Sequence, residues 1–396
     1  MGNLLKSLFE NKGNVISEQV IDAQKQMGVD NTDLNRIFNA YKQDAQSEGT
    51  DPIIFADKST IKDATEKISK LSDVKQKEIF EIMLKNTGTS FRFSSFNELS
   101  LNLMIRSAII KKIITIENEW DADWSNPYAN YPARRQPLSL PTEYWELAGI
   151  GGFKSIDGSD KKKAVELLFK KNQEMIIDCN RMSVIVAYGG LLDATEEDSF
   201  KELFSKDIFE KLFEKQKCIV VGTWQESYGT HGEVTLLANK YFTEVSLYNG
   251  RFNDKSVNSC IPGDVVYFKN SNSYEFLRLE IEAFLSNTGY SADARNEILS
   301  DERLSEAWKG EYCICTNADK FAGFGIGEKN NVELTSTEIR EKLLKQAADL
   351  YDLAYEKASP IKRKIEKIGM QKPTIEEVTL YNKGYRLNSN NIIKKI

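Results

Sequence analysis

Histidine is nearly absent from this chain, since only one of its 396 residues, His231, is a histidine. Chemistry that needs an imidazole as a base or as a metal ligand therefore has a single candidate. The five cysteines are odd in number and irregularly spaced, which argues against a disulfide framework. No Cys-x-x-Cys pair occurs, so we expect no structural zinc site and no other bound metal.

Two further absences narrow the class of protein. No apolar run approaches the ~18 residues of a membrane span, and the net charge of −6 argues against a general nucleic-acid binder. The composition, with 41% hydrophobic residues, 28% charged residues and only 8 prolines, is typical of a soluble globular protein. We expect no membrane and no nucleic acid as partner, and a cytoplasmic location. A protein exported by a secretion system that needs no signal peptide would have the same sequence features.

The length of the chain predicts two or three domains. Residues 1–86 are rich in polar side chains at helical spacing. They predict a small N-terminal helical module that aids folding or docking, or binds a specific partner. Residues 87–358 form the expected main domain, with insertions at 223–258 and 272–307. Residues 359–396 are basic and rich in asparagine, and we expect a loosely attached, solvated tail rather than a binding arm.

Apolar patterns predict the core of the main domain. Residues 96–116 repeat apolar side chains at helical spacing, and residues 180–192 are apolar nearly all round, so both predict buried helices. Residues 261–270 and 308–316 predict strands. A turn at 317–319 then returns the chain, which predicts a β-hairpin.

Cys179 stands at the head of the buried helix predicted for 180–192, directly after Asp178. A free thiol, with a pKa near ~8.5, is mostly protonated at pH 7, and the partial positive charge of a helix N-terminus stabilises the reactive thiolate. Asp178 opposes that thiolate, although it could accept its proton. The backbone N–H of Cys179 could donate to an oxyanion. The alternative is that Cys179 is a small, packed hydrophobic residue, as free cysteines often are.

Two residues compete for the role of base. His231 lies in a loop-like stretch with glycines on both sides, and it is a surface residue, a substrate contact or the base. Glu311 follows Gly310 at the head of an apolar strand, where a carboxylate is either solvated or directed into a site. A carboxylate matches a thiol poorly unless burial raises its pKa. The residues alone leave this choice open.

Several blocks of the sequence, in the same order, resemble the bacterial protein-glutamine γ-glutamyltransferases of the Bacillus spore-coat type, the transglutaminases. The resemblance covers roughly residues 90–350. It is carried by residues 95–99, 144–145, 152, 163–165, 178–179, 191–200, 263–270, 308–311 and 319–326.

The resemblance implies an α+β fold with a papain-like, cell-wall-peptidase-like core. In such a core the helix that bears the nucleophile packs on a small antiparallel sheet. By the same resemblance Cys179 is the nucleophile, Glu311 is the main base, and Asp178 can partly replace it. We assign Trp224, Trp308 and His231 to substrate contacts.

The implied reaction is a cysteine-dependent acyl transfer. A thioester on the cysteine joins a protein glutamine to a protein lysine as an isopeptide crosslink, with no cofactor, and the resemblance suggests a role in sporulation or the spore coat. Two departures stand out: Gly323 occupies the place of a family histidine, and Asp178 the place of a glutamate. They leave two alternatives. One is a protein glutamine deamidase, for example one that is secreted as an effector, and the other is a degenerate relative that binds proteins without catalysis.

Overall fold

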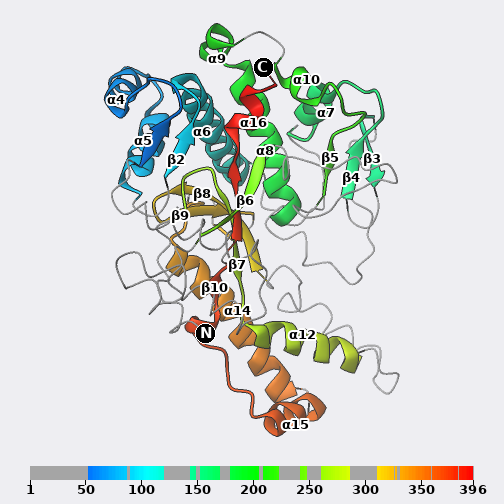
Figure 1. Ribbon diagram of the computed structural model, residues 1–396. Helices are drawn as coiled ribbons and strands as arrows, with labels where there is room; N and C mark the ends of the chain where they lie inside the picture. The colour runs from blue at the N-terminus through cyan, green and yellow to red at the C-terminus, as the bar shows by residue number, and fades with distance from the viewer. Residues whose placement is uncertain are drawn as a thin grey trace, which may run out of the picture. The chain divides into compact units, whose positions relative to one another are not determined.

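The computed structural model describes residues 52–86, 90–119, 143–148, 152–169, 179–204, 208–222, 241–247, 260–285, 310–324, 326–327, 331–357, 359–381 and 383–395. The chain divides into two compact units, Met1–Asp51 and Pro52–Ile396, and every described residue belongs to the second unit (Figure 1). Most of the expected N-terminal module therefore lies outside the described residues. Within them, no helix combines the length and the apolar content that a membrane span requires.

A mainly antiparallel sheet organises this unit. Its strands follow the order β6-β11-β7-β8-β9, and the short strand β10 also pairs with β7. The strands are β6 (Phe242–Ser246), β7 (Val265–Lys269), β8 (Gly310–Asn317), β9 (Lys320–Gly323), β10 (Thr379–Leu380) and β11 (Lys383–Leu387). β8 and β9 form the hairpin that the sequence predicts, and the Asn317 side chain accepts a hydrogen bond from the Ala318 N–H at its turn.

Two long helices, α6 (Phe96–Glu119) and α8 (Cys179–Glu196), pack closely on each other. Both match helices that the sequence predicts, and α8 is buried on nearly all sides, as its apolar composition requires. Gly190 of α8 lies so close to α6 that an added Cβ would be 2.4 Å from Ile109 Cγ1 and 2.7 Å from its Cα. The approach of the two helices thus depends on a residue without a side chain.

The two faces of the sheet bury different hydrophobic clusters. Val265, Ile314 and Ala322 belong to the cluster that contains α6 and α8. Their strand neighbours belong to a second cluster, with the helix α14 (Ser336–Lys357): this group includes Val266, Cys313, Phe321, Ile339 and Leu343. The alternation along each strand therefore assigns each side chain to the α8 face or to the α14 face of the sheet.

The C-terminal segment is part of this sheet, so the expectation of a loosely attached tail is wrong. After α15 (Ser359–Ile368) and the short helix η4 (Ile375–Glu377), the chain forms β10 and β11 and ends in α16 (Ser389–Ile393). β11 lies between β6 and β7. Its Tyr385 and Leu387 are buried, while Lys383, Arg386 and the polar residues around them made the segment resemble a solvated tail.

Smaller elements surround this core. β1 (Ile53–Phe55) pairs in parallel with β2 (Phe91–Phe93), next to α4 (Ile61–Ser69) and α5 (Val74–Lys85). A second sheet contains β3 (Trp145–Ala148), β4 (Gly152–Ser155) and β5 (Val220–Val221). α7 (Lys161–Leu167) and α10 (Ile208–Phe213) pack on each other and on α8, and α9 (Asp198–Leu203) contacts α8 and α6. α12 (Asn272–Leu285) packs on α14 and α15, so the described part of the insertion expected at 272–307 is an ordered helix.

Candidate active site

Cys179 is the first residue of α8, at the end of the helix where the sequence predicts it. Its side chain is half-buried, unlike the fully packed residues of the following turns. The Sγ atom lies 3.9 Å from the backbone oxygen of Gly310, the first residue of β8. The helix N-terminus and the start of this strand therefore meet at the sulfur, although 131 residues separate them along the chain.

Gly310 leaves room for a tyrosine from the neighbouring strand. A Cβ at Gly310 would lie 2.2 Å from Tyr267 Oη and 2.4 Å from its Cζ, so only glycine fits this position. The Tyr267 ring also packs against Tyr312, with 4.7 Å between ring centroids, and meets Tyr381 edge-on at 6.3 Å. Sequence reasoning missed Tyr267; its alternation with Val265 on one strand is the signal that places it on the α8 face.

Glu311 is buried, with only 6% of its surface exposed, so the solvated reading of this carboxylate is wrong. It pairs with Phe268 across the sheet and shares with Cys313 the α14 face of β8, which is opposite to the face of α8 and Tyr267. A Cβ at Gly323 would lie 2.9 Å from Glu311 Oε1 and 2.7 Å from Cys313 Sγ. Any residue at 323 with a side chain would therefore clash with the Glu311 carboxylate unless the carboxylate moved. Its backbone is directly joined to the Gly310 carbonyl that touches the sulfur.

Cys179 and Glu311 act electrostatically on the same neighbours. Burial raises the pKa of Tyr267, and Cys179, Tyr312 and Glu311 raise it further. Burial also raises the pKa of Cys313 well above its usual range, with Glu311 and then Cys179 as the next causes. Tyr267 therefore keeps its proton at neutral pH, and Cys313 stays a neutral thiol.

The other cysteines divide by burial. Cys260 and Cys315 are buried, and burial is the main cause that raises the pKa of each thiol. Cys218, like Cys179, is half-buried. Since thiolate character and access control reactivity, Cys260, Cys313 and Cys315 suit a structural role. Of the two accessible cysteines, Cys179 alone begins a long helix.

Four of the sequence-predicted site residues lie outside the described residues: Asp178, Trp224, His231 and Trp308. Their roles stay predictions. In the described part of the chain, no group of three or more histidine, cysteine, aspartate or glutamate side chains is arranged to hold a metal ion.

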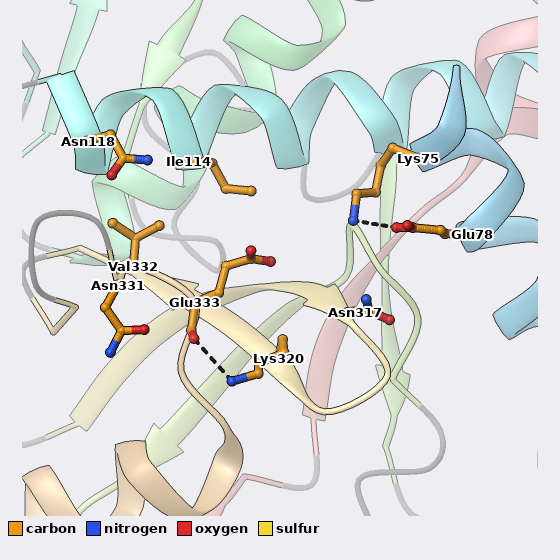
Figure 2. A pocket seen from close by; sticks show the side chains of 9 residues that line it. All are labelled: Lys75, Glu78, Ile114, Asn118, Asn317, Lys320, Asn331, Val332 and Glu333. Atoms are coloured by element: carbon orange, nitrogen blue, oxygen red, sulfur yellow. Dashed lines mark hydrogen bonds and ion pairs between the residues drawn. The ribbon is translucent and has the colours of Figure 1, made fainter. Parts of the chain in front are cut away.

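A cavity of about 640 Å³ lies elsewhere, between α5, the C-terminal part of α6, the β8–β9 turn and residues 331–333 (Figure 2). Its lysines already have partners: Lys75 pairs with Glu78 at 2.6 Å, and Lys320 Nζ donates to the Glu333 carbonyl at 3.4 Å. It contacts β8 at Asn317, the end opposite Gly310, about 23 Å away along the strand. None of its lining residues belongs to the surroundings of Cys179.

Cys179 lies in the part of the chain that matches a known protein family. The model of the family described as protein-glutamine gamma-glutamyltransferase matches residues 53–276, more than half of the chain. The chain belongs to this family, which confirms the resemblance inferred from the sequence blocks. The matched region includes Cys179 and Tyr267 but ends before Glu311.

Curated relatives are similar at low identity. A protein-glutamine gamma-glutamyltransferase of Bacillus cereus (strain 03BB102) is 23% identical over 195 residues, 49% of this chain and 55% of the relative. One of Bacillus mycoides (strain KBAB4) is 23% identical over 259 residues, 65% of this chain and 68% of the relative. The chain spans about half the length of most of these relatives.

One solved structure is also similar, a transglutaminase from Geobacillus stearothermophilus without its C-terminal extension. It is 15% identical, has a TM-score of 0.41, and the match covers 75% of this chain and 96% of that one.

Proposed function

We propose that this protein is a cysteine-dependent transglutaminase that joins protein glutamine and lysine side chains through a thioester on Cys179. The observation that carries the proposal is the contact of Cys179 Sγ with the Gly310 carbonyl at 3.9 Å. It joins the head of an 18-residue helix to the strand that bears Glu311, inside a chain of this family. The packing of α8 on an antiparallel sheet supports the papain-like reading of the core.

The proposed chemistry has two halves. The Cys179 thiolate attacks the γ-carboxamide carbon of a protein glutamine, and the tetrahedral intermediate collapses to a thioester as ammonia leaves with an added proton. A lysine ε-amine then attacks the thioester carbon, loses a proton and releases the thiolate. Glu311, a buried carboxylate one residue after the Gly310 carbonyl at the sulfur, is the proposed main proton carrier, as the family resemblance implies. Asp178 is the proposed partial substitute.

The remaining assignments complete the proposal. Trp224, Trp308 and His231 contact the substrate, and no cofactor takes part. Residues 87–358 carry the chemistry, while β11 from the C-terminal segment completes the sheet beneath it. The protein acts on protein substrates in the cytoplasm or the spore coat.

A labelling experiment tests the proposal. The full chain is mixed with a glutamine-bearing protein whose lysines are blocked and with a fluorescent primary amine. We expect amine incorporation that Cys179→Ala abolishes. Cys218→Ala is the matched control, because that cysteine is also half-buried but does not begin a long helix, and this variant should keep full activity.

Two other outcomes would replace the proposal. Release of ammonia without incorporation of the amine would identify a deamidase, in which water resolves the thioester. If the wild-type protein unfolds cooperatively on heating but yields neither product, it is a non-catalytic binding protein.

A further inference from the structure

We propose that Tyr267 is the hydrogen-bond donor that holds the Cys179 thiolate ready for attack. This inference deepens the proposed function, because it rests on Cys179 being the nucleophile. Three observations carry it: the place of the phenol hydroxyl, the packing that fixes its ring, and the charge state of the groups around it.

The hydroxyl of Tyr267 lies directly against Gly310. The position that a Gly310 Cβ would occupy is 2.2 Å from the phenol oxygen, so no side chain separates the phenol from the backbone of this residue. The carbonyl of the same residue is the group that Cys179 Sγ touches at 3.9 Å. Tyr267 also belongs to the α8 face of the sheet, the side on which Cys179 lies. One glycine thus contacts both the phenol and the sulfur.

The ring has little freedom to turn away. Tyr312 packs against it from β8 with ring centroids 4.7 Å apart, and Tyr381 meets it edge-on at 6.3 Å. A donor held by its neighbours loses little entropy when it forms a hydrogen bond. Glycine at 310 is the sequence feature that makes room for this arrangement.

Four acidic groups and one further ring surround the Tyr267 phenol. They are Cys179 of α8, Tyr312 of β8, Glu311 on the opposite face of β8, Glu275 of α12 and the ring of Tyr381 after β10. Burial raises the pKa of the phenol first, and the four acidic neighbours among them raise it further. The phenol therefore carries its proton at neutral pH, which is the state that a donor to a thiolate requires.

The test is the pH dependence of alkylation of Cys179 by iodoacetamide, with the labelled peptide quantified by mass spectrometry so that the other cysteines do not contribute. Tyr267→Phe removes the hydroxyl and keeps the ring. A hydrogen bond to a charged group is strong enough to move the midpoint of the alkylation profile upward by about one pH unit. Tyr312→Phe, in the adjacent ring, is the matched control and should leave the midpoint unchanged. Thermal unfolding of each variant reports whether the fold is kept.

The outcomes separate this inference from the proposed function. An unchanged midpoint in Tyr267→Phe overturns the inference, and so does an equal shift in Tyr312→Phe, which would report general loosening. If the wild-type protein crosslinks and Tyr267→Phe leaves the alkylation midpoint unchanged, only the role of Tyr267 is disproved. If the midpoint depends on Tyr267 but the wild-type protein does not crosslink, the role of Tyr267 stands and the transglutaminase proposal is disproved. If Tyr267→Phe unfolds, Tyr267→Met, a smaller side chain without a hydrogen-bond donor, should show the same upward shift.

Discussion

Arg386 of β11 donates two hydrogen bonds to Asp264, from Nε at 3.0 Å and from Nη2 at 2.7 Å, both to Oδ2. Asp264 Oδ1 accepts another, at 2.9 Å, from Arg106 of α6, which also donates to the Pro262 carbonyl. Asp264 and Arg106 are almost completely buried. One carboxylate thus joins α6, the turn that leads into β7, and the C-terminal strand.

Replacing Asp264 with Asn should destabilise the fold severely. The substitution leaves two arginine side chains in or near the core without their anionic partner, a loss on the order of 3–5 kcal/mol. Denaturant unfolding followed by circular dichroism measures it. The matched control is Glu244→Gln, which removes the exposed partner of Lys383 on the neighbouring strand and should change stability by less than about 0.5 kcal/mol. Equal losses of stability in the two variants would show that the buried Asp264–arginine cluster stabilises the fold no more than an exposed ion pair does.

The same cluster predicts a dependence of stability on acid. Burial alone would raise the pKa of Asp264, but Arg386 and Arg106 outweigh it and hold the pKa below its usual value. The contribution of Asp264 is therefore fully present above about pH 4, the ordinary pKa of the unfolded group, and is lost as pH falls through the lower folded value. Unfolding curves from pH 7 to pH 3 should show the gap between the wild-type protein and Asp264→Asn shrinking in that acid range. A gap that stays constant would mean that another group carries the acid sensitivity.

Deleting residues 383–396 should abolish the folded state. The deletion removes β11, which alone joins β6 to β7 among the described strands, together with Arg386 and α16. It also removes Ser389, whose hydroxyl donates to Glu98 and accepts from Asn102 in the core. We expect aggregation or loss of a cooperative thermal transition. Deletion of residues 395–396 alone is the control and should unfold like the full chain; a stable protein without β11 would restore the description of a dispensable tail.

The sequence predicted the parts of the fold whose signals are local. α6 and α8 have continuous apolar faces, and the β8–β9 hairpin has an apolar strand followed by a polar turn. β11 was missed because Arg386 looks solvent-exposed in the sequence, and only its pairing with Asp264, 122 residues away, explains why its side chain is only 12% exposed. Tyr267 escaped for the same reason, since nothing near it in sequence shows that its hydroxyl lies on Gly310. The position of Cys179 at a helix head made it a candidate nucleophile, but its assigned role and that of Glu311 as base came from the family resemblance.

Two adjacent glycines of α8 should respond differently to alanine. A Cβ at Gly190 would lie 2.7 Å from Ile109 Cα and 2.8 Å from its N, so the backbone of α6 blocks it. A Cβ at Gly189 would meet mainly the end of the Phe169 ring, at 2.4 Å, which can shift. We expect Gly190→Ala to cost about 1–3 kcal/mol by overpacking, and Gly189→Ala to be near neutral because alanine favours the helix by about 1 kcal/mol. Chemical denaturation compares them, and a reversed order would mean that α6 and α8 are not packed as described.

Glu311→Gln should reduce transglutaminase activity far more than His231→Ala does. Removal of a general acid–base catalyst, the role proposed for Glu311, costs about 10²–10⁴-fold in rate, whereas His231 is proposed only to contact substrate. Glutamine keeps the size of the buried side chain, so thermal unfolding should change little and the loss should appear in kcat rather than in the fold. Amine incorporation by both variants, measured over a range of pH, provides the comparison. A comparable loss in His231→Ala would move the base from the carboxylate to the single imidazole of the chain.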